Sequence, residues 1–183
     1  MLTVCLQKII SPHAKIFIYN RDKSNLLAHK ITDDEELERI GREIRDRLKI
    51  YDKYPPVLCH TDLSTKNILV NDGEITLIDW DDVYSLCWIH DIAELTFWMK
   101  QGYDKKSAEI YRAAFLESYQ TEYDINDFYK AEPVLHARIS LNSLNYFVNK
   151  PQENAIKRLL KDSFEKCGIK GFTVFVPDCR YVS

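Results

Sequence analysis

Four polar side chains in one short stretch have the types and spacing needed to bind a metal ion and a phosphate group. His60 begins a polar loop, Asp62 follows two residues later, and Asn67 five residues after that. A second carboxylate, Asp79, stands at the end of a hydrophobic run. Carboxylate and amide oxygens are ligands that Mg²⁺ accepts, and a nearby carboxylate can take the proton of an attacking hydroxyl. The stretch therefore contains the residue set for phosphoryl transfer to a hydroxyl group.

A β-hairpin is the element expected to position these residues. Residues 68–70 and 74–78 are mostly apolar and flank Asn71-Asp72-Gly73, in which the Asp-Gly pair suits turn positions with positive φ. Asn67 then starts one strand and Asp79 ends the other. Antiparallel pairing would bring these two residues, twelve positions apart in the chain, close enough to share one ion.

The remainder of the chain is predicted to be mainly helical. Apolar spacings of three and four predict a helix that starts at Thr32, where Thr32 and Glu35 fit a capping box, and ends before Pro55-Pro56. Beyond Val83 the pattern predicts helices. The expected elements are a strand at 15–19, a short strand or extended segment at 57–59, helices at 90–100, 107–119, 127–150 and 152–166 (the last ended by Gly168), and a strand at 171–177.

Composition excludes several classes of protein. With 183 residues, 45% of them hydrophobic and 29% charged, the chain has the make-up of one globular domain. A net charge of −3 gives no reason to expect nucleic acid or a membrane surface as partner, and no apolar run approaches the ~20 residues that span a bilayer. The five scattered cysteines favour reduced thiols over disulfides or a zinc site. We expect a cytoplasmic protein.

The order of these motifs resembles the catalytic core of the aminoglycoside phosphotransferase and choline kinase superfamily, whose fold is kinase-like. Residues 58–63 are similar to its catalytic loop, 78–81 to its metal-binding segment, and 90–93 to the helix start that follows. The resemblance covers about residues 56–98. It implies an α+β fold: a protein-kinase-like C-terminal lobe, mainly helical, with a small β-hairpin that carries the metal ligands.

The resemblance also implies a role for each site residue. Asp62 would be the catalytic base, and Asn67 and Asp79 would bind Mg²⁺ next to the phosphates of ATP or another nucleoside triphosphate. The acceptor would be a small hydroxylated molecule. The residues implied as supporting or nucleotide-binding are His60, which buttresses the loop; Leu69 and Ile78, which line the adenine and phosphate region; Asp91, which braces the loop backbone; and Asp81, near the metal or the acceptor.

The chain departs from the family pattern in several ways. Thr61 stands where the family commonly has Gly, and Ser64 stands where protein kinases have a Lys, which favours a small-molecule kinase. No Gly-rich phosphate loop or strand lysine precedes His60 in this sequence, so we expect the N-terminal nucleotide lobe to be absent. The expected division is a segment 1–31 without a clear pattern, a kinase-like catalytic and substrate lobe at 32–168, and a tail at 169–183.

Two alternatives to a truncated or incomplete phosphotransferase remain open at this point. The chain could be an inactive lobe, or one that binds a partner. Residues 77–83 also resemble the nucleophile motif of haloacid-dehalogenase-type phosphatases, in which Asp79 would form an aspartyl phosphate and Asp81 would act as acid and base. That motif normally opens a parallel sheet, whereas helices are predicted downstream here. The main prediction is a small-molecule phosphotransferase.

Overall fold

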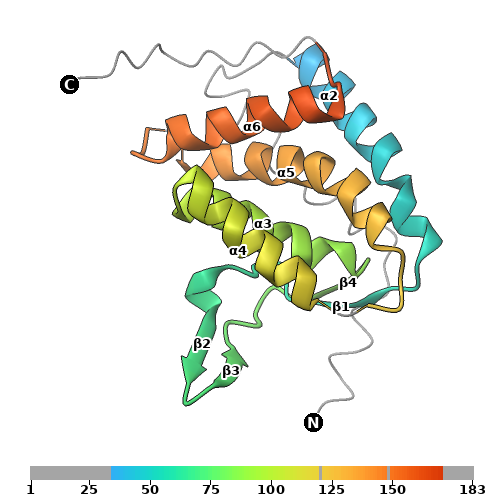
Figure 1. Cartoon of the computed structure of the whole chain (residues 1–183). Helices are drawn as coiled ribbons and strands as arrows, with labels where there is room; N and C mark the ends of the chain where they lie inside the picture. Colours follow the sequence, from blue (N-terminus) through green and yellow to red (C-terminus); the bar gives the residue numbers. More distant parts are fainter. Residues whose placement is uncertain (1–33, 120, 148, 171–183) are drawn as a thin grey trace.

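The structure is a computed structural model, and it describes residues 34–119, 121–147 and 149–170 (Figure 1). A group of helices forms most of this part, and a hairpin projects from it. In chain order the elements are α2 (Asp34–Arg47), the 3₁₀ helix η2 (Leu48–Lys53), β1 (Val57–Cys59), the 3₁₀ helix η3 (Thr65–Asn67), β2 (Ile68–Asn71), β3 (Glu74–Leu77), β4 (Tyr84–Leu86), α3 (Ile89–Gly102), α4 (Lys105–Ser118), α5 (Ile125–Phe147) and α6 (Glu153–Cys167).

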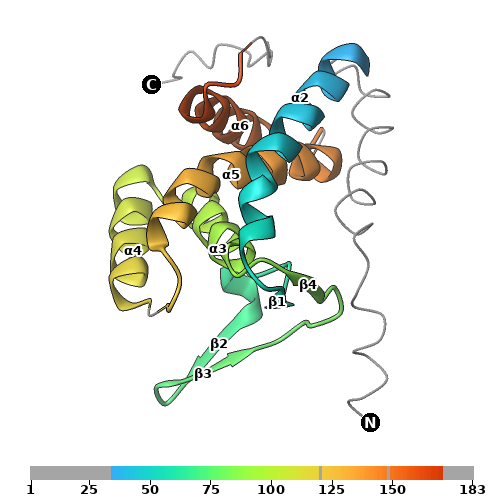
Figure 2. The same ribbon diagram turned by 90° about the vertical axis from the view of Figure 1, so that its right-hand side faces the viewer.

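Helix α5 is the centre of the helical body, by which we mean α2, η2 and α3 to α6. It contacts α2, η2, α3 and α6, while α4 packs against α3 (Figures 1 and 2). One apolar cluster includes the fully buried Phe97 and Leu144, and a second includes Phe128 and Leu135. Complete burial of such a side chain stabilises the fold by roughly 1.5–3 kcal/mol. The core therefore extends along α3 and α5 and includes Ile89 and Ile92 at the start of α3.

The predicted helices are confirmed, with ends that differ by a few residues. The stretch predicted as one or two helices from 127 is a single helix, α5, up to Phe147. Helix α6 ends as expected at Gly168, whose φ of +67° is the left-handed conformation that glycine adopts without strain. The α-helix α2 ends at Arg47, and the 3₁₀ helix η2 follows it directly up to Lys53, just before the two prolines.

The predicted hairpin is also confirmed. Strand β2 pairs antiparallel with β3, from Ile68 opposite Leu77 to Asn71 opposite Glu74. The turn places Asp72 at φ +49° and Gly73 at φ +83°, the positive values for which an Asp-Gly pair is suited. The hairpin extends away from the helices (Figures 1 and 2) and exposes apolar side chains on both faces. Its position therefore depends on the loops at its base.

The prediction that the chain turns helical directly beyond Val83 is wrong for the next three residues. Tyr84–Leu86 form β4, which pairs antiparallel with β1 so that Cys59 lies opposite Tyr84. A three-residue strand has no hydrophobic period of its own, so only its distant partner defines it. This pairing brings the residues that follow β1 beside those that precede β4, which are the two segments expected to form the site.

The α+β class is confirmed: the described residues are mainly helical and contain two small antiparallel sheets. Three predictions lie outside the described residues: the strands at 15–19 and 171–177, the capping box at Thr32, and the absence of an upstream lobe. The domain division stays a prediction. The cysteines described, Cys59, Cys87 and Cys167, are free thiols. None of the described helices combines the length and apolar composition needed to cross a membrane.

Candidate active site

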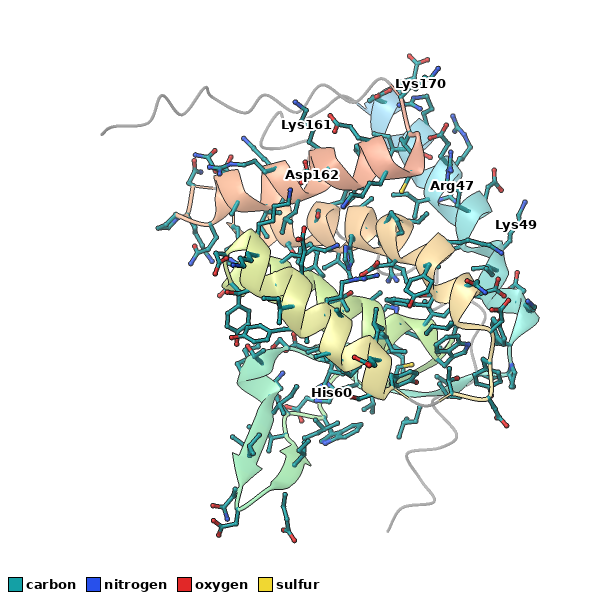
Figure 3. All side chains as sticks on the ribbon, viewed as in Figure 1. Arg47, Lys49, His60, Lys161, Asp162 and Lys170 are labelled. Atoms are coloured by element: carbon teal, nitrogen blue, oxygen red, sulfur yellow. The ribbon has the colours of Figure 1, made fainter. Side chains whose placement is uncertain are left out.

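His60 lies at the junction between the hairpin and the helical body (Figure 3) and is 1% exposed. Its Nε2 is 2.7 Å from the carbonyl oxygen of Ile78, which can only accept, so Nε2 carries the hydrogen. Its Nδ1 accepts a long hydrogen bond of 3.4 Å from the N–H of Asp62. The ring also packs against Trp80, with centroids 4.7 Å apart. His60 thus holds its own loop and the end of β3 together.

Asp91 connects this loop to α3. Its carboxylate accepts hydrogen bonds from the N–H of His60 at 2.7 Å and from the N–H of Thr61 at 3.0 Å. Burial raises the pKa of the Asp91 carboxyl, and the two backbone hydrogen bonds partly offset this effect. Asp91 stands in the first turn of α3, where the helix dipole favours a negative charge. The backbone N–H groups of His60 and Thr61 are therefore fixed to the helical body, and the supporting role of Asp91 in an active site stays a prediction.

Asp62 and Asn67 are in direct contact. Asn67 is 4% exposed, and its Nδ2 donates to the backbone carbonyl of Asp62 at 2.8 Å and to Oδ2 of the same residue at 3.0 Å. Both acceptors require the amide nitrogen, so Oδ1 of Asn67 is the oxygen left for another partner. The Nζ of Lys66 lies 3.0 Å from Asp62 Oδ2. The tight turn of η3 makes these contacts possible by folding the loop back on itself.

The hairpin brings the backbone of Asn67 next to Asp79. The N–H of Ile78 donates to the carbonyl of Asn67 at 3.1 Å, which extends the β2–β3 pairing by one step, and Asp79 is the next residue. Asp79 has φ +64°, an uncommon value for a residue other than glycine, and its side chain is exposed. The two predicted metal ligands are thus neighbours in the fold, and metal binding by them stays a prediction.

The remaining predicted residues lie on the hairpin and just after it. Leu69 is 50% exposed and sits opposite Thr76, and Ile78 follows two residues after Thr76, so Leu69 and Ile78 point to the same face. Ile78 is 37% exposed, and Asp81 is exposed as well. An exposed apolar face next to Asn67 and Asp79 is compatible with the predicted nucleotide contact, which stays a prediction.

Glu94 is a buried acid one helical turn beyond Asp91. It is 8% exposed, and its Oε1 accepts a hydrogen bond of 3.1 Å from Trp98 Nε1. The pKa of Glu94 is raised to about 7, mainly by burial. The Trp98 hydrogen bond and Arg138 partly offset the effect of burial, and the charges of Asp62 and Asp91 add to it. A carboxylate that carries a proton near neutral pH therefore lies behind the loop of Asp62.

The sequence pattern predicts no role for Lys66, for the side chain of Thr61 or for Glu94. Each nevertheless has a signal that can be read from the chain. Lys66 stands four residues after Asp62 with the opposite charge, and Glu94 stands three residues after Asp91, on the same helix face. Thr61 occupies a position where glycine is expected, and the structure gives it φ +61°.

The sequence of the chain also identifies its family. Residues 12–129 match the phosphotransferase enzyme family, and this match includes every residue of the predicted site. No curated protein and no solved structure matches the chain. The matched segment is more than half of the chain, which confirms the resemblance to aminoglycoside phosphotransferases inferred from the His60–Asn67 loop. The chain belongs to the phosphotransferase enzyme family.

Proposed function

We propose that the chain transfers the γ-phosphoryl group of ATP to a hydroxyl group of a small molecule, with Mg²⁺ as cofactor. The observation that carries the proposal is the position of Asn67, whose amide nitrogen is bonded to Asp62 while its backbone is paired beside Asp79. One buried residue thereby links the predicted base to the predicted metal ligand. Family membership supports the same reaction class.

Asp62 is the residue we assign as catalytic base. Its Oδ2 is held by Asn67 Nδ2 and by Lys66 Nζ, so the carboxylate is oriented before any substrate arrives. The acceptor oxygen forms its bond to the γ-phosphorus as the bond to the ADP oxygen breaks, and Asp62 takes the hydroxyl proton. His60 and Asp91 act through the backbone, because their hydrogen bonds fix the peptide groups around Thr61. A base positioned in this way typically contributes 10²–10⁴ in rate.

The residues near Asp79 fit a magnesium ion in their chemistry. Asn67 offers Oδ1, because its Nδ2 is engaged with Asp62, and Asp79 offers an exposed carboxylate. Among the described residues, no group of three or more His, Cys, Asp or Glu side chains could hold a metal ion alone. Mg²⁺ does not require such a group, since substrate phosphates and water usually complete its six ligands. When bound, the ion would neutralise charge on the phosphates.

The hairpin and the residues just after it are assigned to the nucleotide and the metal. We assign the adenine and phosphate region to the hairpin face of Leu69 and Ile78, and Asp81 to the edge of the metal or acceptor site. The acceptor class follows from Ser64, which replaces the lysine that protein kinases use at this position. A small hydroxylated molecule is therefore the proposed acceptor, in preference to a protein side chain.

The test is a turnover assay of the purified chain with Mg²⁺ and ATP against a panel of amino sugars and amino alcohols. Asp62→Asn is expected to lower kcat about 10²–10⁴-fold with unchanged thermal stability. Asp46→Asn is the matched control, because Asp46 is an exposed acid on α2 away from the loop, and its kcat is expected to equal that of the wild type.

Three outcomes would count against the proposal. Near-normal turnover by Asp62→Asn would remove the assigned base. No product with any acceptor, together with no binding of Mg²⁺ and ATP at millimolar concentration, would favour an inactive or partner-binding lobe. Acid-stable trapping of an acyl phosphate on Asp79 would favour the phosphatase alternative.

A further inference from the structure

The segment Ile78–Asp82 is attached to the His60–Asn67 loop at both of its ends. At the first end, the Ile78 carbonyl accepts from His60 and the Ile78 N–H donates to Asn67. At the other end, the hydroxyl of Thr61 donates to the backbone carbonyl of Asp82. The three residues between these attachments are Asp79, Trp80 and Asp81, all exposed. Between the two ends, Trp80 donates from Nε1 to the carbonyl of Leu77 at 2.8 Å and packs on the His60 ring. The two end attachments and Trp80 therefore define where Asp79 points.

Thr61 holds this attachment in a conformation that threonine rarely adopts. Its φ is +61°, in the left-handed region, where a β-branched side chain is strained and glycine is not. Such a conformation persists only where the surrounding structure enforces it. Here the N–H of Thr61 donates to Asp91 while its hydroxyl donates to Asp82, so both ends of the residue are engaged. A glycine would fit the backbone better but could not donate from a hydroxyl.

We infer that Thr61 is a positioning residue. Its hydroxyl bond to Asp82 keeps Asp79 in place relative to Asp62 and Asn67. This inference rests on the proposed function, because it assigns Asp79 to the metal. Without the hydroxyl, the segment keeps its attachment at Ile78 and the contacts of Trp80 with Leu77 and His60. Asp82 loses its bond to the loop, and Asp79 gains freedom. Asp62 keeps its contacts with Asn67 and Lys66, which do not involve Thr61. The expected defect is therefore in the use of magnesium, with little change in the chemical step.

Three substitutions separate the hydroxyl from the backbone strain. Thr61→Ser keeps the hydroxyl, Thr61→Val keeps the branched shape without it, and Thr61→Gly removes both the hydroxyl and the strain. One neutral hydrogen bond corresponds to roughly a three- to tenfold change in an equilibrium. Thr61→Val and Thr61→Gly are expected to raise the Mg²⁺ concentration for half-maximal turnover by roughly three- to tenfold, with kcat at saturating Mg²⁺ within about twofold of wild type. Thr61→Ser is expected to match the wild type.

A second measurement does not depend on turnover. Trp80 lies inside the segment and is 42% exposed, whereas Trp88 is 5% exposed and Trp98 is half-buried in the helical body. Acrylamide quenching of tryptophan fluorescence in the free protein therefore reports mainly on Trp80. Quenching is expected to increase in Thr61→Val and Thr61→Gly, and to remain at the wild-type level in Thr61→Ser.

The two measurements distinguish failure of the inference from failure of the proposed function. Wild-type magnesium dependence and quenching in Thr61→Gly would overturn the inference, because the hydroxyl would then hold nothing. Equal effects in Thr61→Ser and Thr61→Val would overturn it too. If no acceptor is phosphorylated, the proposed function fails, and the quenching of the three variants still decides whether the hydroxyl holds the segment.

Discussion

Two buried glutamates, one in the middle of the helical body and one behind the candidate site, have opposite pKa shifts. Glu132 on α5 accepts hydrogen bonds from Nε and Nη2 of Arg112, at 2.8 and 2.6 Å. Burial alone would raise the pKa of Glu132, but the Arg112 hydrogen bonds, followed by the effects of His136 and Lys100, outweigh burial and lower the pKa to about 2. Glu94 on α3 accepts from the indole N–H of Trp98 and has the imidazole Nε2 of His90 3.9 Å away, and its pKa is raised to about 7. The difference is the counter-charge.

The comparison shows that the two regions are stabilised in different ways. In the helical body a buried carboxylate is fully paired, as buried charges need to be. Behind the site, Glu94 lies close to the acids Asp62 and Asp91, and its helix neighbour His90 stays neutral because burial lowers the His90 pKa to about 3. Near neutral pH Glu94 therefore holds a proton part of the time, whereas Glu132 is ionised. Glu94 thus costs the site region stability as pH rises, while the Arg112–Glu132 pair stabilises the helical body.

Removal of the counter-charge in the helical body is expected to have the largest effect. Arg112→Met leaves Glu132, whose side chain is 8% exposed, without its main partner, and the loss of one member of a buried pair costs about 3–5 kcal/mol. At about 2–4 °C per kcal/mol for a chain of this size, differential scanning calorimetry should show a clear decrease in Tm. The double variant Arg112→Met/Glu132→Leu should regain most of it. A double variant as unstable as Arg112→Met would show that pairing is not what stabilises this pair.

Removal of the unpaired charge behind the site is expected to stabilise the protein. The folded-state pKa of Glu94 is raised, from 4.5 to about 7, so the wild type loses stability as pH rises through this window. Glu94→Gln keeps an acceptor for Trp98 and should be more stable than wild type at pH 8, by on the order of 3 kcal/mol, and equal to it at pH 4. Urea unfolding of both proteins at pH 4 and at pH 8 measures this difference. Besides burial, the groups that shift the Glu94 pKa are Trp98, Arg138, Asp62 and Asp91.

Urea unfolding at different pH values also tests Glu132, whose pKa is shifted in the opposite direction. Its depressed pKa adds stability above pH 4.5 that is lost as pH falls toward about 2. Glu132→Gln should therefore be less stable than wild type at pH 6, with the difference shrinking below pH 4. A stability difference of the same sign for Glu94→Gln and Glu132→Gln at neutral pH would contradict the comparison.

A change in the hairpin turn is expected to have a smaller and local effect. Gly73→Ala places a side chain at φ +83°, which costs about 1–2 kcal/mol although no atom lies within 4 Å of the added Cβ. Because the hairpin contributes little to the core, amide hydrogen exchange in β2 and β3 should accelerate while Tm changes little. Gly102→Ala is the matched control, because Gly102 has equal space and no positive φ. Faster exchange in α3 or α5 of Gly73→Ala would mean that the hairpin and the helical body unfold together.

The smallest effect on stability is expected at Lys66. Its ion pair with Asp62 joins side chains that are 67% and 35% exposed, and such pairs contribute about 0–1 kcal/mol. Lys66→Met should therefore shift Tm by less than about 4 °C in a thermal melt. A decrease as large as that of Arg112→Met would remove the distinction between the two regions.

Much of the local structure could be predicted from the sequence. The Asp72-Gly73 turn, the helix end at Gly168 and the apolar periods of the helices are local signals, and each is present in the structure. Strand β4 could not be predicted in this way, because three residues have no period and their partner is β1. The sequence carries a signal for Lys66, Thr61 and Glu94 but does not define their contacts, because these depend on the path of the loop and on burial.

By itself, the sequence determined the family, the α+β class and the residue types of the candidate site, since spacing and turn chemistry are properties of neighbouring residues. The tertiary structure alone decided which groups meet. Asp91 reaches the loop of His60 from thirty-one residues away, and Arg112 reaches Glu132 across twenty. Burial and counter-charge depend on such distant contacts. For this reason Glu132 is ionised near pH 7, whereas Glu94, whose pKa is about 7, still holds its proton part of the time.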